Sequence, residues 1–179
     1  MKKKFKVAIV GCGGISKVHA NAWRDSDQID LVAACDDNVQ ALKSFVDQFE
    51  VPNSYLDLRT LLESQKLDVL VITTWPSSHL KNVLEAVRAK VKKVLCEKPL
   101  AINTKQVEQM IQVVRKPQTN NTPVLLTEAF MYRHHPLTQE IRSKICDGKI
   151  GELRSINLVF NTGFTDQTNW RLRGDLGGG

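Results

Sequence analysis

The chain alternates short apolar runs with stretches in which apolar residues recur at helical spacing. Leu80, Val83, Leu84 and Val87, for example, fall on one face of a helix. Buried strands alternating with amphipathic helices are typical of a parallel sheet covered on both faces, so we expect an α/β, doubly wound fold. The runs that predict strands are 5–10, 31–35, 53–55, 69–72, 94–96 and 124–126.

The pattern changes beyond residue 127. Leu137, Ile141 and Ile145 predict one more helix, and Gly148 is its expected stop. Residues 153–160 predict a longer strand, for which the remaining sequence supplies no partner strand. We therefore expect a doubly wound domain over 1–127, followed over 128–179 by an incomplete C-terminal α+β domain.

Charge and composition narrow the functional classes. The chain has 179 residues and a formal net charge of +6. Its basic residues are scattered outside the N-terminal cluster and form no nucleic-acid motif, so we expect no nucleic-acid partner. No apolar run is long enough for a membrane span, and no apolar signal segment follows the N-terminal lysines. We therefore expect a cytoplasmic protein without a membrane partner.

The cysteines give no sign of a metal site or a disulfide framework. Cys12, Cys35, Cys96 and Cys146 are far apart, and none forms a C-x-x-C pair. Most of them lie in or beside apolar runs, where a reduced cysteine behaves as a small buried hydrophobic residue. We expect neither zinc nor disulfides.

A glycine-rich loop follows the first predicted strand. The segment Gly11-Cys12-Gly13-Gly14-Ile15-Ser16 has the form G-x-G-x-x-S. The first glycine permits a tight turn, the second lets the backbone approach a pyrophosphate, and the helix N-terminus offers free amides. Many glycine-rich turns are only turns, but this one joins a strand to a helix near the chain start. It therefore predicts dinucleotide binding.

Asp36 ends the second predicted strand, where an acidic residue can hydrogen-bond the ribose 2′-OH of NAD. The alternative is a helix N-cap, a role that Asp37 or Asn38 could fill equally well. The Asp36-Asp37 pair would repel a 2′-phosphate, and no arginine or lysine follows directly. The sequence therefore favours NAD as cofactor, with NADP as second choice.

Glu97-Lys98-Pro99 follows the fifth predicted strand. A lysine at the carboxyl end of this strand would lie over the expected nicotinamide site. There it could hydrogen-bond a substrate hydroxyl and help move its proton. Position alone favours an exposed loop lysine with no chemical role.

Three segments occur in a fixed order: GCGGISKVH, VLCEKPLA and TEAFMYRHHP. Together they resemble the Gfo/Idh/MocA oxidoreductase family, and the resemblance runs from Val7 to Gly179. It implies a Rossmann-type NAD(P)-binding domain and hydride transfer between NAD(P) and a sugar or polyol. In the full-length family it also implies a homo-oligomer. An alternative for this chain is a non-catalytic nucleotide-binding fragment or regulatory module.

The resemblance assigns roles to the loops. It makes Lys98 the catalytic lysine, and it implies that Glu97 orients the loop or contacts the cofactor. Because X-Pro bonds adopt the cis form more readily than other peptide bonds, Lys98–Pro99 is a candidate for it. The residues that would form the dinucleotide loop are Gly11, Gly13, Gly14 and Ile15.

The resemblance also places residues beyond the glycine loop. Glu128 and the pair Tyr132-Arg133 would line the active site at the domain junction, and Trp170-Arg171 matches an N-W-R motif on the substrate side. After the fourth strand the family often shows T-P-N-x-x-H, whereas this chain has Thr74-Trp75-Pro76-Ser77-Ser78-His79.

Thr74 and His79 remain cofactor-side candidates, although a histidine in the first turn of a helix is more often structural. Trp75 is a candidate to pack on the cofactor, and for His19 we expect structural hydrogen bonding. The sequence ends in a G-G-G segment that in the family introduces an Asp-x-Gly-x-His or Asp-x-Gly-x-Tyr motif, so we expect a truncated form.

Overall fold

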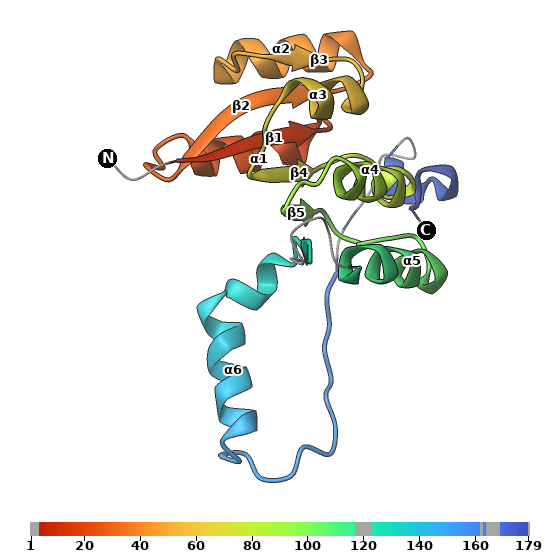
Figure 1. Cartoon of the computed structure of the whole chain (residues 1–179). Coiled ribbons are helices and arrows are strands. Elements are labelled where there is room, and N and C mark those ends of the chain that lie inside the picture. The colour runs from red at the N-terminus through yellow and green to blue at the C-terminus, as the bar shows by residue number, and fades with distance from the viewer. Residues whose placement is uncertain (1–3, 117–122, 162, 164–168, 179) are drawn as a thin grey trace.

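The computed structural model describes residues 4–116, 123–161, 163 and 169–178. Its centre is a 6-stranded parallel sheet with strand order β3-β2-β1-β4-β5-β6 (Figure 1). The strands are β1 Phe5–Val10, β2 Ile29–Cys35, β3 Ser54–Tyr55, β4 Val69–Ile72, β5 Lys93–Cys96 and β6 Leu125–Glu128.

Helices cover both faces of this sheet. The α-helices are α1 Gly14–Trp23, α2 Val39–Phe49, α3 Leu58–Ser64, α4 Pro76–Arg88, α5 Thr104–Arg115 and α6 Pro136–Cys146. Short 3-10 turns follow β6 and lie near the C-terminus: η1 Met131–His134, η2 Trp170–Leu172 and η3 Gly174–Leu176. The predicted α/β class with a doubly wound, Rossmann-type sheet is confirmed.

The alternation of side chains along the strands divides the core into two layers. Val7 and Ile9 of β1 face the layer that contains α1 and α2, where Phe45 is fully buried. Ala8 and Val10 face the opposite layer, which is filled from α3, α4 and α5. Both faces of the sheet are therefore covered, which explains why its strands read as continuous apolar runs.

Local capping fixes where several helices begin. The Asn38 side chain accepts hydrogen bonds from Gln40 N and Ala41 N and caps α2. The Asp57 side chain accepts a hydrogen bond from Thr60 N and caps α3. The cap of α5 is Asn103, whose side chain accepts a hydrogen bond from Gln106 N.

The side of the sheet to which successive strands are added changes between β1 and β4, although all strands stay parallel. The chain leaves β1 toward β2 and β3 on one side, and continues from β4 toward β5 and β6 on the other. In such sheets a crevice opens outside the carboxyl ends of the strands at this switch point, because the adjoining loops diverge. The glycine loop and the loop after β4 both lie at this point.

Beyond β6 the chain leaves the sheet through η1 and α6 and then returns toward it (Figure 1). The predicted helix over 137–145 is confirmed, and Gly148 follows it with φ +67°. The predicted strand over 153–160 is wrong. A strand needs a neighbour for its backbone hydrogen bonds, and no described segment pairs with these residues.

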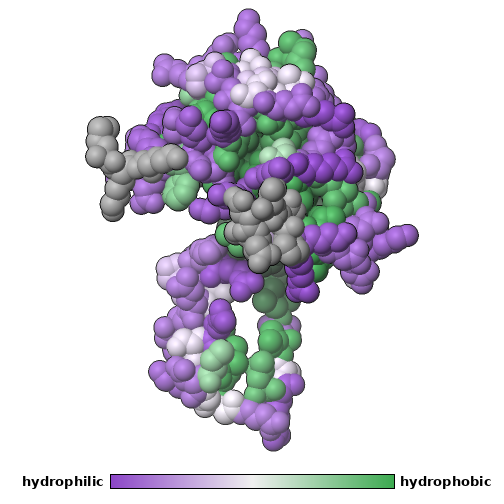
Figure 2. Space-filling model, in the orientation of Figure 1, coloured by the Kyte–Doolittle hydropathy of each residue, from purple (hydrophilic) through white to green (hydrophobic). Residues whose placement is uncertain are grey.

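This extension carries many exposed apolar side chains, on α6 and on the returning segment (Figure 2). They include Leu137 and Ile141 on the helix and Ile156, Leu158 and Phe160 on the return. Exposed apolar patches of this kind are typical of surfaces that bind a protein, a membrane or a ligand. The division into units 1–127 and 128–179 stays a prediction.

The C-terminal turn comes back to the sheet. η3 contacts α4, and a Cβ added to Gly177 would lie 2.7 Å from Ile102 Cγ2 and 2.8 Å from Pro76 Cβ. The turn therefore packs tightly at the start of α4, beside the switch point. Among the helices in the described ranges, none combines the length and apolar content needed to cross a membrane.

The fold predicts how the thiols react. Burial raises the pKa of Cys12 and of Cys35 to about 12, with nearby carboxylates adding to the effect, and burial also raises that of Cys96. Cys146 is exposed. A raised thiol pKa leaves the neutral, unreactive form at pH 7. A disulfide reagent should therefore label only Cys146 rapidly in the native protein, and all 4 cysteines after denaturation. Rapid native labelling of a Cys146→Ser variant would contradict this assignment.

Candidate active site

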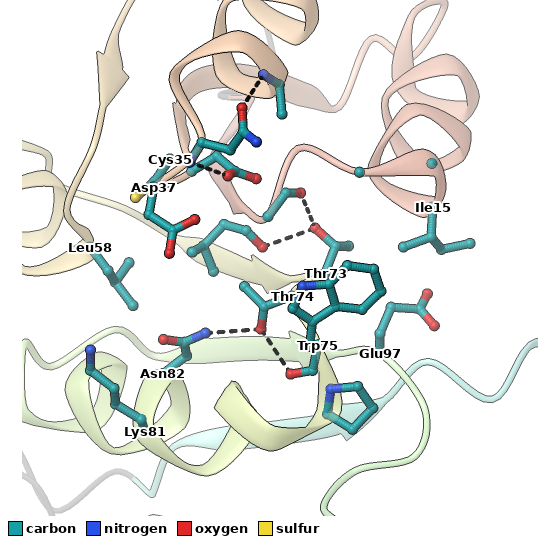
Figure 3. A pocket seen from close by; sticks show the side chains of 18 of the residues that line it. Ile15, Cys35, Asp37, Leu58, Thr73, Thr74, Trp75, Lys81, Asn82 and Glu97 are labelled. Atoms are coloured by element: carbon teal, nitrogen blue, oxygen red, sulfur yellow. Dashed lines mark hydrogen bonds between the residues drawn. The ribbon is translucent and has the colours of Figure 1, made fainter. Parts of the chain in front are cut away.

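A cleft of about 820 Å³ opens at the carboxyl ends of the strands, around the switch point (Figure 3). The glycine loop, the end of β2, the loop after β4 and the loop after β5 all contribute to its walls. The predicted site residues that line it are Gly11, Gly13, Gly14, Ile15, Asp36, Thr74, Glu97, Lys98 and Arg171.

Gly11 makes the turn that starts the glycine loop. Its φ is +93°, and an added Cβ would lie 2.7 Å from backbone atoms of Thr73 and Thr74. The buried Thr73 hydroxyl lies 2.6 Å from Gly11 O and 2.9 Å from Val10 O, so it ties this turn to the end of β4. Only glycine fits a backbone that is both left-handed and this close to another backbone.

The next two glycines have the opposite environment. No heavy atom lies within 4 Å of a Cβ placed on Gly13 or Gly14, so the space beside them is open toward the cleft. Gly13 is the N-cap of α1 and has no side chain to occupy the first amides of the helix. These amides and the positive end of the helix dipole are therefore available to an anion such as a pyrophosphate.

Asp36 supports the loop from the second strand. Its Oδ2 accepts a hydrogen bond from Cys12 N at 2.6 Å, and its Oδ1 accepts one from Asn38 N at 2.8 Å. Asp37 also lines the cleft and is exposed. Two neighbouring carboxylates thus stand at this end of the cleft, and one of them also orients the glycine loop.

The loop after β5 holds Lys98 at the cleft, exposed to solvent. Glu97 N donates to Ile72 O at 2.9 Å, and the Lys98–Pro99 bond is cis, as the sequence suggested. Glu128 Oε1 accepts a hydrogen bond from Leu100 N at 3.0 Å. The lysine therefore stands on a backbone that neighbouring strands fix on either side.

Glu97 is buried and paired. Its Oε1 lies 2.8 Å from His19 Nε2, and its Oε2 accepts a hydrogen bond from Lys98 N at 3.2 Å. Burial opposes ionisation of this carboxyl, but hydrogen bonds from His19 and Lys98 N, with the charges of both residues, outweigh it. The pKa of Glu97 consequently lies below its usual value.

His79 does not line the cleft, so its expected contact with a cofactor is corrected here. It is fully buried, with Nδ1 2.9 Å from Pro99 O and Nε2 3.0 Å from Thr74 O. The imidazole thus lies behind the wall, between the loops after β4 and β5, and holds their backbones together. This is the structural role that a histidine in the first turn of a helix more often has.

The residues predicted for the substrate side do not all line the cleft. Tyr132 and Arg133 lie on η1, exposed, and do not belong to the described lining of the cleft. Arg171 does line it, because the chain returns to the sheet there. The side chain of Trp170 lies outside the part of the structure that can be described.

Several lining residues were not selected from the sequence. Lys81 and Asn82 enter from α4, and Asn82 Nδ2 donates to Thr74 Oγ1 at 3.1 Å (Figure 3). Leu56 and Leu58 enter from beside α3. For Leu56 and Leu58 the available signal was their position just after β3, and for Lys81 and Asn82 it was their place in the first half of the helix that follows β4. Trp75, suggested as a cofactor contact, also lines the cleft.

A sequence model described as "Oxidoreductase family, NAD-binding Rossmann fold" matches residues 5–122, which is well over half of the chain. The chain belongs to the Gfo/Idh/MocA oxidoreductase family. This confirms the family and the NAD-binding Rossmann domain that the motifs implied. It also agrees with the geometry, because the matched residues contain the glycine loop and Lys98.

Named relatives include a sugar dehydrogenase and a polyol dehydrogenase. The chain is 32% identical over 149 residues to a D-apiose dehydrogenase of Paraburkholderia graminis, covering 83% of this chain and 38% of that protein. It is 26% identical to a myo-inositol 2-dehydrogenase of Thermotoga maritima, covering 83% of this chain and 42% of that one. The chain therefore spans about two fifths of the length of these relatives.

Solved structures share the fold. An oxidoreductase from Agrobacterium radiobacter, in complex with NAD+, L-tartaric acid and magnesium, superposes with a TM-score of 0.74 at 27% identity. The match covers 84% of this chain and 42% of that one. The WlbA dehydrogenase from Bordetella pertussis, in complex with NADH and UDP-GlcNAcA, gives a TM-score of 0.75 at 27% identity, with 83% and 44% covered.

The contrast between the glycines gives a test of the loop. Gly11→Ala should lower the free energy of unfolding by about 2 kcal/mol or more, because it adds left-handed strain and a clash with backbone. Gly14→Ala, the matched control, should change it by less than about 1 kcal/mol, because the added methyl meets open space at the start of α1. Urea unfolding followed by circular dichroism measures both, and equal losses would refute the assignment of Gly11 as the constrained position.

Proposed function

We propose that this chain binds NAD(H) in the cleft and supports hydride transfer between the cofactor and a CH–OH group of a sugar or polyol. The observation that carries the proposal is the shared cleft: the open glycine loop and Lys98 line the same cavity. Family membership supports it, because the matching description is an NAD-binding oxidoreductase. The activity of a whole enzyme is part of the proposal, since the chain spans only part of its relatives.

The residues present fit a dinucleotide. Open space beside Gly13 and Gly14, at an uncapped helix start, suits a pyrophosphate. Asp36 keeps acceptor capacity for ribose hydroxyls, because each carboxylate oxygen has a second lone pair beyond its backbone partner. When bound, NAD+ accepts the hydride that leaves the substrate carbon.

We assign transfer of the substrate hydroxyl proton to Lys98. Its position at the carboxyl end of β5, exposed in the cleft, allows it to hydrogen-bond a substrate hydroxyl. As hydride departs from the carbon, the hydroxyl oxygen loses its proton and becomes a carbonyl oxygen. A lysine amine held at that oxygen can accept the proton in one direction and return it in the other.

The substrate side rests on the relatives. Sugar and inositol dehydrogenases among them support a polyhydroxylated substrate. Arg171 is the substrate-side candidate that lines the cleft, and we propose it as a substrate contact together with Tyr132, Arg133 and Trp170. Assembly into a homo-oligomer, a cytoplasmic location and the lack of nucleic-acid or membrane partners stay predictions.

Cofactor binding can be tested without turnover. Titration with NADH, followed by its fluorescence, should show saturable binding to the native chain. Gly13→Asp should stay folded, because its Cβ meets open space and aspartate is a good N-cap. The new carboxylate would occupy the amides that we assign to the pyrophosphate and repel it, so we expect at least about tenfold weaker binding. Unchanged NADH affinity in this variant would refute the assigned phosphate site.

Lys98→Met tests the chemical role. Its rate of NADH formation over a panel of sugars and polyols should fall by about 100-fold or more, the usual loss for a general acid–base group. The dissociation constant for NADH should change by less than about threefold, because the lysine acts on the substrate oxygen. A variant as active as the native chain would contradict this role. NADH binding without turnover by the native chain would instead support a non-catalytic nucleotide-binding module.

The paired carboxylates predict the cofactor preference. NADPH should bind at least about tenfold more weakly than NADH, because its 2′-phosphate would stand beside Asp36 and Asp37. Asp37→Ser should narrow that difference and leave NADH affinity nearly unchanged, since Asp36 still supports the glycine loop. Parallel fluorescence titrations with both cofactors measure the ratio, and a native preference for NADPH would overturn the assignment.

A further inference from the structure

His19 joins two parts of the cleft that are far apart in sequence. It lies on α1, the helix that begins at the glycine loop, and its Nε2 is 2.8 Å from Glu97 Oε1. A carboxylate oxygen only accepts, so the imidazole is the donor. The pair is largely withdrawn from water, with side-chain exposure of 18% for His19 and 10% for Glu97.

Glu97 also contacts the backbone of Lys98. Glu97 Oε2 accepts a hydrogen bond from Lys98 N at 3.2 Å, so one carboxylate connects His19 to the backbone of Lys98. The rest of the loop is held independently. Pro99 O faces His79, and Leu100 N donates to Glu128. His19 is thus the described contact that links this loop to the helix of the glycine loop.

The chemistry of the pair favours a precise placement. Hydrogen bonds with a charged partner are shorter and stronger than neutral ones, and burial strengthens them further. Without its imidazole partner the Glu97 carboxylate would be buried with less compensation, and it would rotate toward solvent or the cleft. Lys98 would then lose the acceptor of its backbone amide.

We propose that His19 is a positioning residue, which fixes the Glu97 carboxylate and thereby couples the glycine-loop helix to the backbone of Lys98. The inference rests on the proposed nicotinamide cofactor for its functional meaning. Binding of phosphates at the start of α1 and placement of the lysine become one event. Neither loop then moves without the other.

A purely structural explanation is also available. The His19 ring lies 5.5 Å from the Trp23 ring, centroid to centroid, so it could serve only to pack one turn of α1. Two substitutions separate the explanations. His19→Phe keeps a ring beside Trp23 but has no donor, whereas His19→Gln loses the ring but places an amide donor near the position of Nε2.

The experiment measures two quantities in the native chain and in both variants. One is the dissociation constant for NADH. The other is the hydrogen-exchange rate of individual backbone amides by nuclear magnetic resonance, in the absence of cofactor. The Leu100 amide is an internal control, because it donates to Glu128 and not to Glu97. Asn21→Ala, at an exposed position of α1, controls for substitution in the helix itself.

In His19→Phe we expect the Lys98 amide to exchange at least about fivefold faster and NADH to bind at least about fivefold more weakly, in line with couplings in hydrogen-bonded networks. The Leu100 amide should not change. His19→Gln should restore both quantities to within about twofold of native. The reverse pattern, with Phe native-like and Gln impaired, would show that packing on Trp23 is the role and would overturn the proposal.

The proposed cofactor site and the coupling through His19 are tested by different results. If the native chain does not bind NADH, the proposed function is wrong, yet the Lys98 exchange rates still test the coupling. If NADH binds to the native chain and to His19→Phe with equal affinity and the Lys98 amide exchanges equally in both, His19 positions nothing. The proposed cofactor site would survive that result.

Discussion

The site depends on the close approach of two backbone turns, one after β1 and one after β4. Gly11 lies so near Thr73 that no Cβ fits between them, and the Thr73 hydroxyl lies within hydrogen-bonding distance of two carbonyl oxygens of the first turn. This contact sets the direction in which α1 leaves the sheet. The free amides at the start of α1 therefore face the crevice between the diverging loops.

The loop that carries Lys98 is also held by contacts with segments distant in sequence, and here the contacts are made by side chains. His19 from α1, His79 from α4 and Glu128 from β6 each reach a different part of it. A single flexible contact would leave an exposed lysine free to move over several ångströms. Attachment to several elements holds the Lys98 backbone in place, which the role in proton transfer that we propose for Lys98 requires.

The segment after β6 is organised differently from the sheet. α6 and residues 151–161 carry exposed apolar side chains, and within the described chain they gain no strand partners. Among the described residues after α6, the turn η3 contacts α4, and Gly177 packs against the start of that helix. Arg171 lines the cleft, so one wall of the cleft depends on how this extension returns to the sheet.

Much of the fold and of the cofactor site follows from local sequence. Continuous apolar runs such as Val69–Ile72 determine buried parallel strands, and Gly11, Gly13 and Lys98 are recognisable because their chemistry depends on their place next to a strand end. Tertiary structure decided the remaining features, because they depend on contacts between residues distant in sequence. The strand expected over 153–160 needed a neighbour that the described chain does not provide. Which of two histidines meets Glu97 and which meets Pro99 is set by the packing of α1 and α4, and no local pattern encodes that choice.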